Sequence, residues 1–454
     1  MKQAYSERFY LNRAGDDAPQ TVRLTLRMNA PVDGQMLSEA VADTQRRYPY
    51  LCVRLCTYKD EHGCEHAAFE ENSLPWVVSD RREPLLLMGN EANRHLLAFA
   101  RWDDCIAFDF FHAIMDGEAA YRVLRTLLYE YCRRRYDNRL SAEGVWTADS
   151  PVSDKEWTDP ATMPRPELPL DLRSLATKGT QESQQTAPNS QQSAAEIPKV
   201  VNIAADPIAP VTDRHEVVHI VTDEAQTMET VRACHGTPAV WLSLLLNKAI
   251  ARLHPDSVDA VPTVVLAVNL RKALGTPLSH HALVGGIMLP LNRAMQDSDI
   301  GAQIAEMRRM VTLQTAPDKL QAYFWQTFER MNLLEQLPTL EARHQAMSQV
   351  KTISRQYGST TLSYVGKANM GAAEQYVREL RTESCTPYLI SLQVAAIGGK
   401  FCLTFMQQFA TDVYLNAFLE ELQRQGITYE ISERHPMEIA PIAEFRRKQS
   451  NNNG

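Results

Sequence analysis

The feature that most constrains the fold is a change of composition near the middle of the chain. Residues 146–172 are rich in proline and acidic residues, and residues 178–196 (KGTQESQQTAPNSQQSAAE) are polar and almost without large apolar side chains. Such a segment buries too little apolar surface to offset the entropy lost on ordering it. A chain of 454 residues is also long enough for two domains. We therefore predict two folded regions, residues 1–172 and 214–454, joined by a flexible linker over residues 173–213.

The first region alternates strands with amphipathic helices. Apolar side chains recur at helical spacing in its helices, and short polar turns separate paired strands. The pattern predicts strands or hairpins at residues 21–28, 51–71 and 95–112, and helices at residues 33–48 and 118–136.

The second region repeats this pattern after the linker. A Thr-Pro pair at residues 237–238 is typical of a helix start. The pattern predicts strands at residues 215–221 and 262–271, a hairpin at 388–409, and helices at 238–253 and 411–426.

Both regions contain a hairpin followed by a short turn and a helix. If the helix caps Asp116 and Thr411 are matched, His112 of the first region falls opposite Gln407 of the second. The two regions are then copies of one unit in which a single copy holds the histidine. Two unrelated domains of the same class would look similar, so both interpretations stay open. A duplicated unit predicts one site, in a cleft between the domains.

Bulk composition excludes several functions. The net charge of −8 argues against a nucleic-acid partner, which would require a basic surplus. The N-terminus has no apolar core of a secretory signal, and no apolar run reaches the ~20 residues that span a bilayer. Eight scattered cysteines in a large chain indicate reduced thiols, so we expect a cytoplasmic protein without a membrane span.

One cluster of cysteines and histidines requires two interpretations. Residues 51–69 hold Cys52, Cys56, His62, Cys64 and His66, which could bind zinc. The spacing is irregular and contains no CxxC pair. The alternation of apolar residues around a polar KDEHG turn favours a plain β-hairpin instead, and we predict no metal site here.

His112 lies in the segment FDFFHAIMDGEAAYRVL, which spans residues 108–124. In the simpler interpretation it is a packed core histidine, and Asp116 is only a helix N-cap. In the functional interpretation it projects from a rigid strand end into a cleft, where a neutral imidazole can take a proton from a hydroxyl or amine.

The residues HAIMDG resemble the HxxxDG motif of the chloramphenicol acetyltransferase-like superfamily, which includes CoA-dependent acyltransferases and peptide-synthetase condensation domains. RRYPYLCVRL, VNLRKAL with GGIMLPL, and TTLSYVGKAN resemble further segments of its alcohol acetyltransferase-like branch. The resemblance implies an α/β fold of two acyltransferase-like domains, each a mixed sheet flanked by helices, with an active-site tunnel between them.

The resemblance also implies roles for individual residues. His112 would be the general base, and Asp116 would pair with Arg271 to hold the shape of the turn. Gly117 would leave space at the tunnel wall. Ser363, or the backbone N–H groups near Tyr364 and Gly366, would stabilise the oxyanion, although an ordinary strand explains these residues equally well.

The implied reaction is transfer of an acyl group, in particular acetyl, from acyl-CoA to an alcohol or amine, without a metal or a permanently bound cofactor. Phe111 stands where condensation domains carry a second histidine, and the DFGWG loop of plant enzymes is absent. An acyl-carrier protein as donor, or a binding protein that performs no catalysis, remain the alternatives. His280–His281 and the arginines at 133–135 are weaker candidates, which we interpret as a loop and a solvated helix end.

Overall fold

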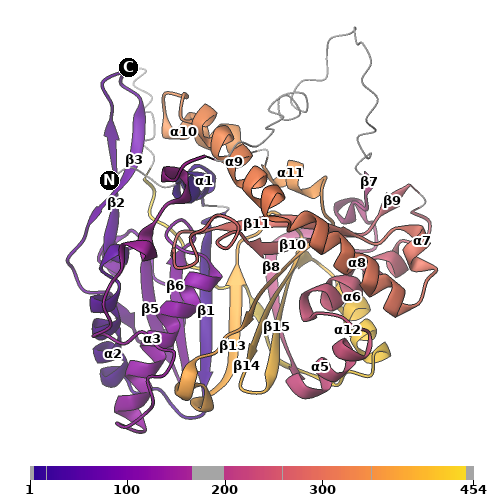
Figure 1. The fold of residues 1–454 in the computed structure, drawn as a ribbon, viewed down its shortest axis with the longest axis horizontal. Helices are drawn as coiled ribbons and strands as arrows, with labels where there is room; N and C mark the ends of the chain where they lie inside the picture. The colour runs from indigo at the N-terminus through magenta and orange to yellow at the C-terminus, as the bar shows by residue number, and fades with distance from the viewer. Residues whose placement is uncertain (1–4, 17, 166–198, 258, 349, 446–454) are drawn as a thin grey trace.

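The computed structural model describes residues 5–16, 18–165, 199–257, 259–348 and 350–445, and the chain folds around two β-sheets (Figure 1). Most of the predicted linker, residues 173–198, lies outside the described residues. Its last part carries the short strand β7 (Lys199–Val200), the 3-10 turn η5 (Ile203–Ala205) and the first residues of β8 (Val211–Asp223). The domain boundaries set from the sequence stay a prediction.

The first sheet holds the strand that leads to His112. Its strand order is β13-β1-β6-β5-β4, and β1 pairs antiparallel with both β6 and β13. Its strands are β1 (Thr21–Met28), β4 (Val78–Ser79), β5 (Leu97–Trp102), β6 (Cys105–Phe111) and β13 (Val377–Ser384). The helices α2 (Gly34–Arg47) and α3 (Gly117–Arg135) pack against each other beside this sheet (Figure 1).

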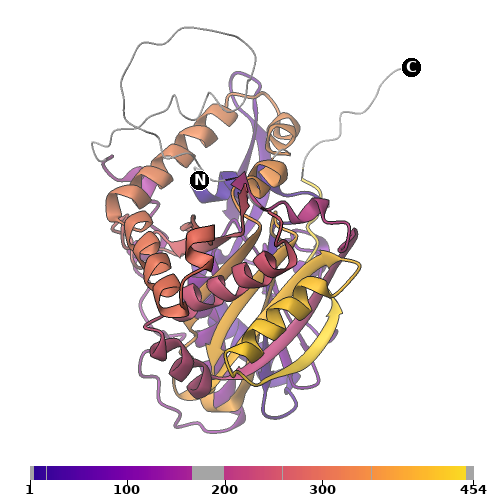
Figure 2. The same ribbon diagram turned by 90° about the vertical axis from the view of Figure 1, so that its right-hand side faces the viewer.

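The second sheet has the order β11-β10-β12-β14-β15-β8-β16. Besides β8, its strands are β10 (Thr263–Asn269), β11 (Val284–Pro290), β12 (Thr360–Lys367), β14 (Ile390–Ile397), β15 (Lys400–Phe409) and β16 (Tyr429–Pro436). The helices beside it are α5 (Glu224–Ala233), α6 (Pro238–Leu253), α8 (Ile300–Gln314) and α12 (Val413–Arg424). Figure 2 shows these helices in front of one face of the sheet. The apolar sides of α6 and α12 form its core together with the strands.

The remaining elements lie around the two sheets. The hairpin predicted at residues 51–71 is confirmed as β2 (Val53–Lys59) and β3 (Glu65–Glu71). The other helices and strands are α1 (Tyr5–Arg13), α7 (Arg293–Gln296), α9 (Pro317–Leu334), α10 (Leu340–Met347), α11 (Val350–Arg355) and β9 (Ala260–Val261). The 3-10 turns are η1 (Pro49–Leu51), η2 (Asn90–Ala92), η3 (Asp154–Trp157), η4 (Pro160–Thr162) and η6 (Gly371–Tyr376). Helix α1 contacts α9 and α10 close to the hairpin (Figure 1).

Two details differ from the sequence pattern. Strand β13 lies far beyond the linker in the sequence, yet it completes the first sheet by pairing with β1. Helix α12 has its N-cap at Asp412, and matching this cap with Asp116 would place Gln408, one residue after Gln407, opposite His112. Periodicity locates a strand or helix, but it carries no information on the sheet that a strand joins.

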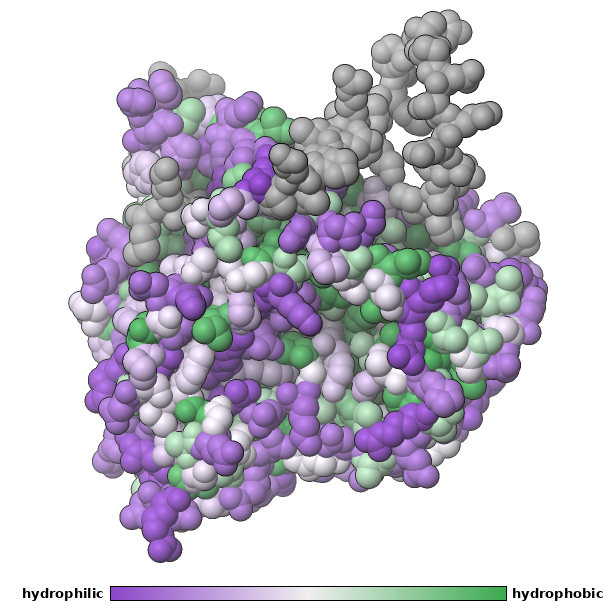
Figure 3. Space-filling model, viewed as in Figure 1, coloured by the Kyte–Doolittle hydropathy of each residue, from purple (hydrophilic) through white to green (hydrophobic). Residues whose placement is uncertain are grey.

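The face of the molecule seen in Figure 3 is mainly polar. Figure 3 shows polar residues spread over the face seen in Figure 1, with apolar residues in small groups between them. None of the helices within the described ranges is both long and apolar enough to cross a bilayer.

Candidate active site

The HAIMDG turn is held rigidly between a buried strand and a helix. Every residue of β6 is buried, and the backbone N–H of His112 donates to the carbonyl of Gln20 at 2.9 Å. The N–H of Ile114 donates to the carbonyl of Phe111 at 3.1 Å, which closes the turn. Asp116 then caps α3 by accepting from the N–H of Ala119 at 3.1 Å.

Asp116 and Arg271 form a buried bidentate ion pair. Two guanidinium nitrogens of Arg271 lie 2.7 and 2.8 Å from the two carboxylate oxygens of Asp116. Burial alone would raise the pKa of Asp116, but the charge and hydrogen bonds of Arg271 lower it below its usual value. The carboxylate also accepts from the N–H of Leu283 at 3.0 Å.

The other guanidinium donors of Arg271 are also used. They reach the carbonyls of Ser279 at 2.7 Å and His281 at 2.8 Å. Because Arg271 lies two residues after the end of β10 in the second sheet, this pair ties the motif of the first half to the second half. The structure thus brings together the two residues that the resemblance paired.

His112 is half-buried and stacked against a tyrosine from α1. The ring centroids of His112 and Tyr10 lie 4.3 Å apart, with 12° between the ring planes. Burial lowers the pKa of His112 below its usual value, and the charge of Asp116 partly opposes this shift. The nearby Arg13 lowers it further. The imidazole is therefore neutral at pH 7 and can accept a proton.

Strand β12, which carries the oxyanion candidates, approaches the motif at Val365. A Cβ added at Gly117 would lie 2.8 Å from Cγ2 of Val365. The space beside Gly117 is therefore occupied by this valine, and a role for Gly117 at a tunnel wall stays a prediction. Ser363 lies two residues before Val365 and so on the same face of the strand, whereas Tyr364 packs against the core of the second half. Gly366 has a φ of 113°, which a glycine adopts without strain.

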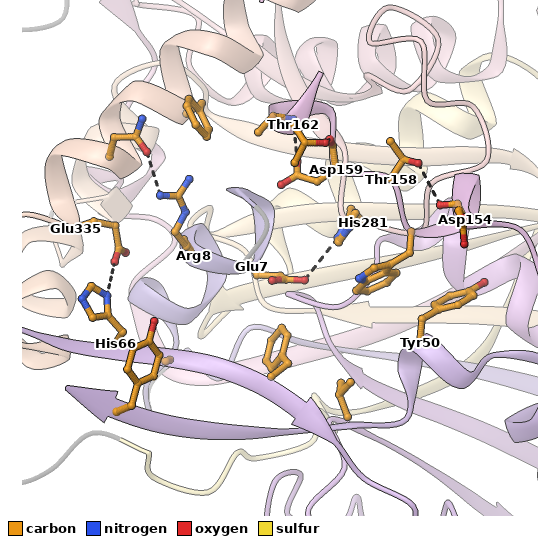
Figure 4. A pocket seen from close by; sticks show the side chains of 18 residues that line it. Glu7, Arg8, Tyr50, His66, Asp154, Thr158, Asp159, Thr162, His281 and Glu335 are labelled. Carbon is orange, nitrogen blue, oxygen red and sulfur yellow. Dashed lines mark hydrogen bonds and ion pairs between the residues drawn. The ribbon is translucent and has the colours of Figure 1, made fainter. Parts of the chain in front are cut away.

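A cavity of about 680 Å³ opens between the two halves. Its walls include Tyr50 and His66 from the first half and His281 and Glu335 from the second (Figure 4). His112 is not among its lining residues. Glu7 on α1 points into the cavity (Figure 4), and Tyr10, one turn later on the same helix, contacts His112. Helix α1 therefore contacts both the cavity and the histidine.

The structure adds site residues that the sequence pattern did not reveal. On α1, Tyr10 stacks on His112 and the charge of Arg13 acts on its pKa, although nothing in YSERFYLNR marks that helix as functional. His280 and His281, which we expected in an ordinary loop, are both buried. His281 lies 3.6 Å from Glu7 and contacts Trp157 with ring centroids 4.0 Å apart.

The arginines at the end of α3 make internal ion pairs. The side chains of Arg133 and Arg134 both contact Glu130, and Arg134 also contacts Asp43. This arrangement is a network that joins α2 to α3, and it leaves these two side chains engaged within the protein.

Comparison with known proteins identifies the fold. The chain is 13% identical to the condensation domain of the Monacolin K polyketide synthase MokA, covering 93% of this chain and 96% of that one with a TM-score of 0.60. It is 11% identical to TRI101 of F. graminearum, solved with coenzyme A and T-2 mycotoxin, covering 94% and 99% with a TM-score of 0.56. It is 12% identical to polyketide synthase associated protein 5 of Mycobacterium tuberculosis. That match covers 93% of this chain and 96% of the other chain, with a TM-score of 0.55.

No protein-family model matches the chain, and no curated protein matches it by sequence. The structural matches span nearly the whole chain and nearly the whole of each neighbour. The predicted fold, two acyltransferase-like α/β halves, is therefore confirmed, and so is the superfamily resemblance at the level of fold.

Proposed function

We propose that the protein transfers an acyl group, in particular acetyl, from acyl-CoA to the hydroxyl or amine of a small acceptor. The observation that carries this proposal is the geometry of the HAIMDG turn. His112 is neutral and fixed by stacking, and its supporting carboxylate is held by Arg271 from the other half. Solved structures of the same fold contain coenzyme A, which supports the choice of donor.

In this reaction His112 accepts the proton of the acceptor as its oxygen or nitrogen attacks the thioester carbonyl. A new C–O or C–N bond forms, and the C–S bond then breaks. The departing thiolate takes the proton back from His112, so that the imidazole ends neutral. Ser363 or a backbone N–H near Tyr364 and Gly366 would stabilise the transient oxyanion. Asp116 takes no part in the proton transfer, because both of its oxygens are occupied by Arg271.

The test is release of free thiol from acetyl-CoA and longer acyl-CoAs, with a panel of alcohols and amines. The wild type is expected to release CoA only when an acceptor is present. His112→Ala should lose ~10²–10⁴-fold in kcat/KM while remaining folded. His62→Gln is the matched control, because this side chain is 79% exposed and should leave the rate unchanged.

Two outcomes would contradict the proposal. An active wild type matched by His112→Ala would show that His112 is a structural histidine. A folded wild type that turns over no thioester of any kind would indicate a binding protein of the same fold.

A second candidate donor is an acyl-carrier protein. The neighbours include condensation domains and a polyketide synthase associated protein, which favours this possibility over other donors. Titration of acyl-CoA against a matched acyl-carrier protein at equal acceptor concentration separates the two. A higher kcat/KM with the carrier protein would show that it, and not CoA, is the physiological donor. The role of His112 would be unchanged.

A further inference from the structure

Three potential metal ligands meet where the two sheets face each other. His219 lies on β8 and His435 on the neighbouring β16, both in the second sheet, whereas Glu383 lies on β13 in the first sheet. The three side chains are at most 10% exposed. The cluster lies outside the candidate active site and contains none of its residues.

The separations between the ligand atoms fit one small cation. The two Nε2 atoms lie 3.0 Å apart, and Oε1 of Glu383 lies 4.0 Å from Nε2 of His219 and 3.7 Å from that of His435. Tetrahedral zinc with bonds of ~2.0–2.2 Å to nitrogen and oxygen requires separations of ~3.3–3.6 Å between its ligand atoms. The observed separations lie on both sides of this range. Movements of the side chains by about half an ångström would bring all three ligand atoms into tetrahedral positions around one zinc ion.

The other ring nitrogen of each histidine is held by a neighbour. The two Nε2 atoms hydrogen-bond to each other, and both could bind a metal ion once His219 loses its Nε2 proton. Nδ1 of His435 lies 2.7 Å from the carbonyl of Pro436, which can only accept, so this nitrogen carries the proton. Nδ1 of His219 lies 3.1 Å from the hydroxyl of Thr404. Oε2 of Glu383 accepts from the N–H of Glu438 at 2.8 Å, which turns Oε1 toward the histidines. Such outer contacts orient the ligands in metal sites.

The arginines around Glu383 are ion-paired with other carboxylates, which leaves the charge of Glu383 for a bound cation to balance. The surrounding arginines each contact another carboxylate: Arg23 with Asp109, Arg27 with Glu379, Arg82 with Glu438, and Arg381 with Glu433. Within the described residues, the ion-pair contacts of Glu383 are to the two histidines.

We propose that Nε2 of His219, Nε2 of His435 and Oε1 of Glu383 bind one divalent transition-metal ion of the zinc class. Two imidazoles and one carboxylate are ligands that zinc prefers, and a water molecule would complete the tetrahedron. The ion would join β13 of the first sheet to β8 and β16 of the second and so fix how the two sheets sit against each other. Its role is structural and separate from acyl transfer.

The experiment measures metal binding directly on the full-length protein without an affinity tag. The protein is stripped with a chelator, dialysed and titrated with Zn²⁺ against a chromophoric competitor. The wild type is expected to bind one Zn²⁺ per chain. Glu383→Gln and His435→Gln should bind at least ~10-fold more weakly. The exposed histidine variant His62→Gln should bind like the wild type.

A second measurement keeps the proposal testable if a variant fails to fold. Co²⁺ added to the stripped wild type should give the visible absorption of a tetrahedral site with nitrogen and oxygen ligands, and Zn²⁺ should bleach it. Zn²⁺ should also raise the Tm of the wild type. Equal zinc binding by wild type and both ligand variants, or a wild type without a stoichiometric site, would overturn the proposal. Neither readout depends on turnover, so they are independent of the proposed function.

Discussion

At the residue scale, the proposed chemistry depends on the protonation state of His112. Burial lowers its pKa below the usual 6.5, and a general base acts only when it is neutral. We therefore expect kcat/KM to rise with pH to a plateau, with a midpoint below 6.5. The profile is measured between about pH 4.5 and 8 with a saturating thioester donor. A midpoint above 6.5 would contradict a base in this environment.

Arg13 provides a way to move that midpoint. Its positive charge disfavours the imidazolium form of His112, so Arg13→Met should raise the pKa and shift the acid limb of the profile to higher pH. Arg46→Met is the matched control, because that side chain is 66% exposed on α2 and should leave the midpoint unchanged. A purely structural role for Arg13 would lower activity at every pH without shifting the profile.

The Asp116–Arg271 pair should contribute to stability as well as to the shape of the turn. Asp116→Ala leaves a buried guanidinium without its partner, which typically costs ~3–5 kcal/mol in the free energy of unfolding. The pKa of Asp116 is lower in the folded state than its usual value of 3.8. Its contribution to the free energy of unfolding is therefore fully present above pH 3.8 and is lost as the pH falls through the lowered pKa.

Urea unfolding of Asp116→Ala at neutral pH measures this cost. The exposed Arg54–Glu70 pair provides the comparison, since Glu70→Ala should cost no more than ~1 kcal/mol. Similar losses from the two variants would mean that the Asp116–Arg271 pair contributes little net stability.

At the element scale, the start of α3 is fitted against the end of β12. Gly117→Ala would place a Cβ 2.8 Å from Cγ2 of Val365, and overpacking of this kind typically costs ~1–3 kcal/mol. Val365→Ala removes the obstructing methyl groups, so the double variant should recover part of the loss. A double-mutant cycle from urea unfolding gives the interaction energy, and strictly additive effects would exclude the contact as the cause.

The same elements show what the sequence could and could not predict. The helix at residues 238–253 was predicted with its observed bounds, because Thr237-Pro238 and the apolar spacing are local signals. The stacking of Tyr10 on His112 was not predictable, because it joins α1 to the end of β6 and leaves no periodic mark in either. His280 and His281 were missed for a related reason: their burial comes from residues 154–158, far away in the sequence.

At the scale of the whole molecule, the general fold could be predicted because HAIMDG and three further segments resemble those of a known superfamily. Asp412 at the N-cap of α12 is also held by two guanidinium nitrogens of an arginine, but this arginine, Arg434, comes from the same half as the aspartate. The division of the strands between the two sheets could not be predicted. Strand β13 follows the second-half strand β12 in sequence but pairs with β1, and only the assembled structure reveals that exchange.

This exchange predicts that the halves are not independent folding units. A fragment of residues 1–165 lacks β13, so β1 becomes an edge strand with unpaired backbone groups on a strand that is otherwise buried. It also loses Arg271, the partner of Asp116. We expect this fragment alone to aggregate or to give the poorly dispersed NMR spectrum of an unfolded chain. Co-expression with residues 199–454 should yield a soluble complex with native circular dichroism. A monomeric fragment 1–165 with cooperative thermal unfolding would show that the first sheet does not require β13.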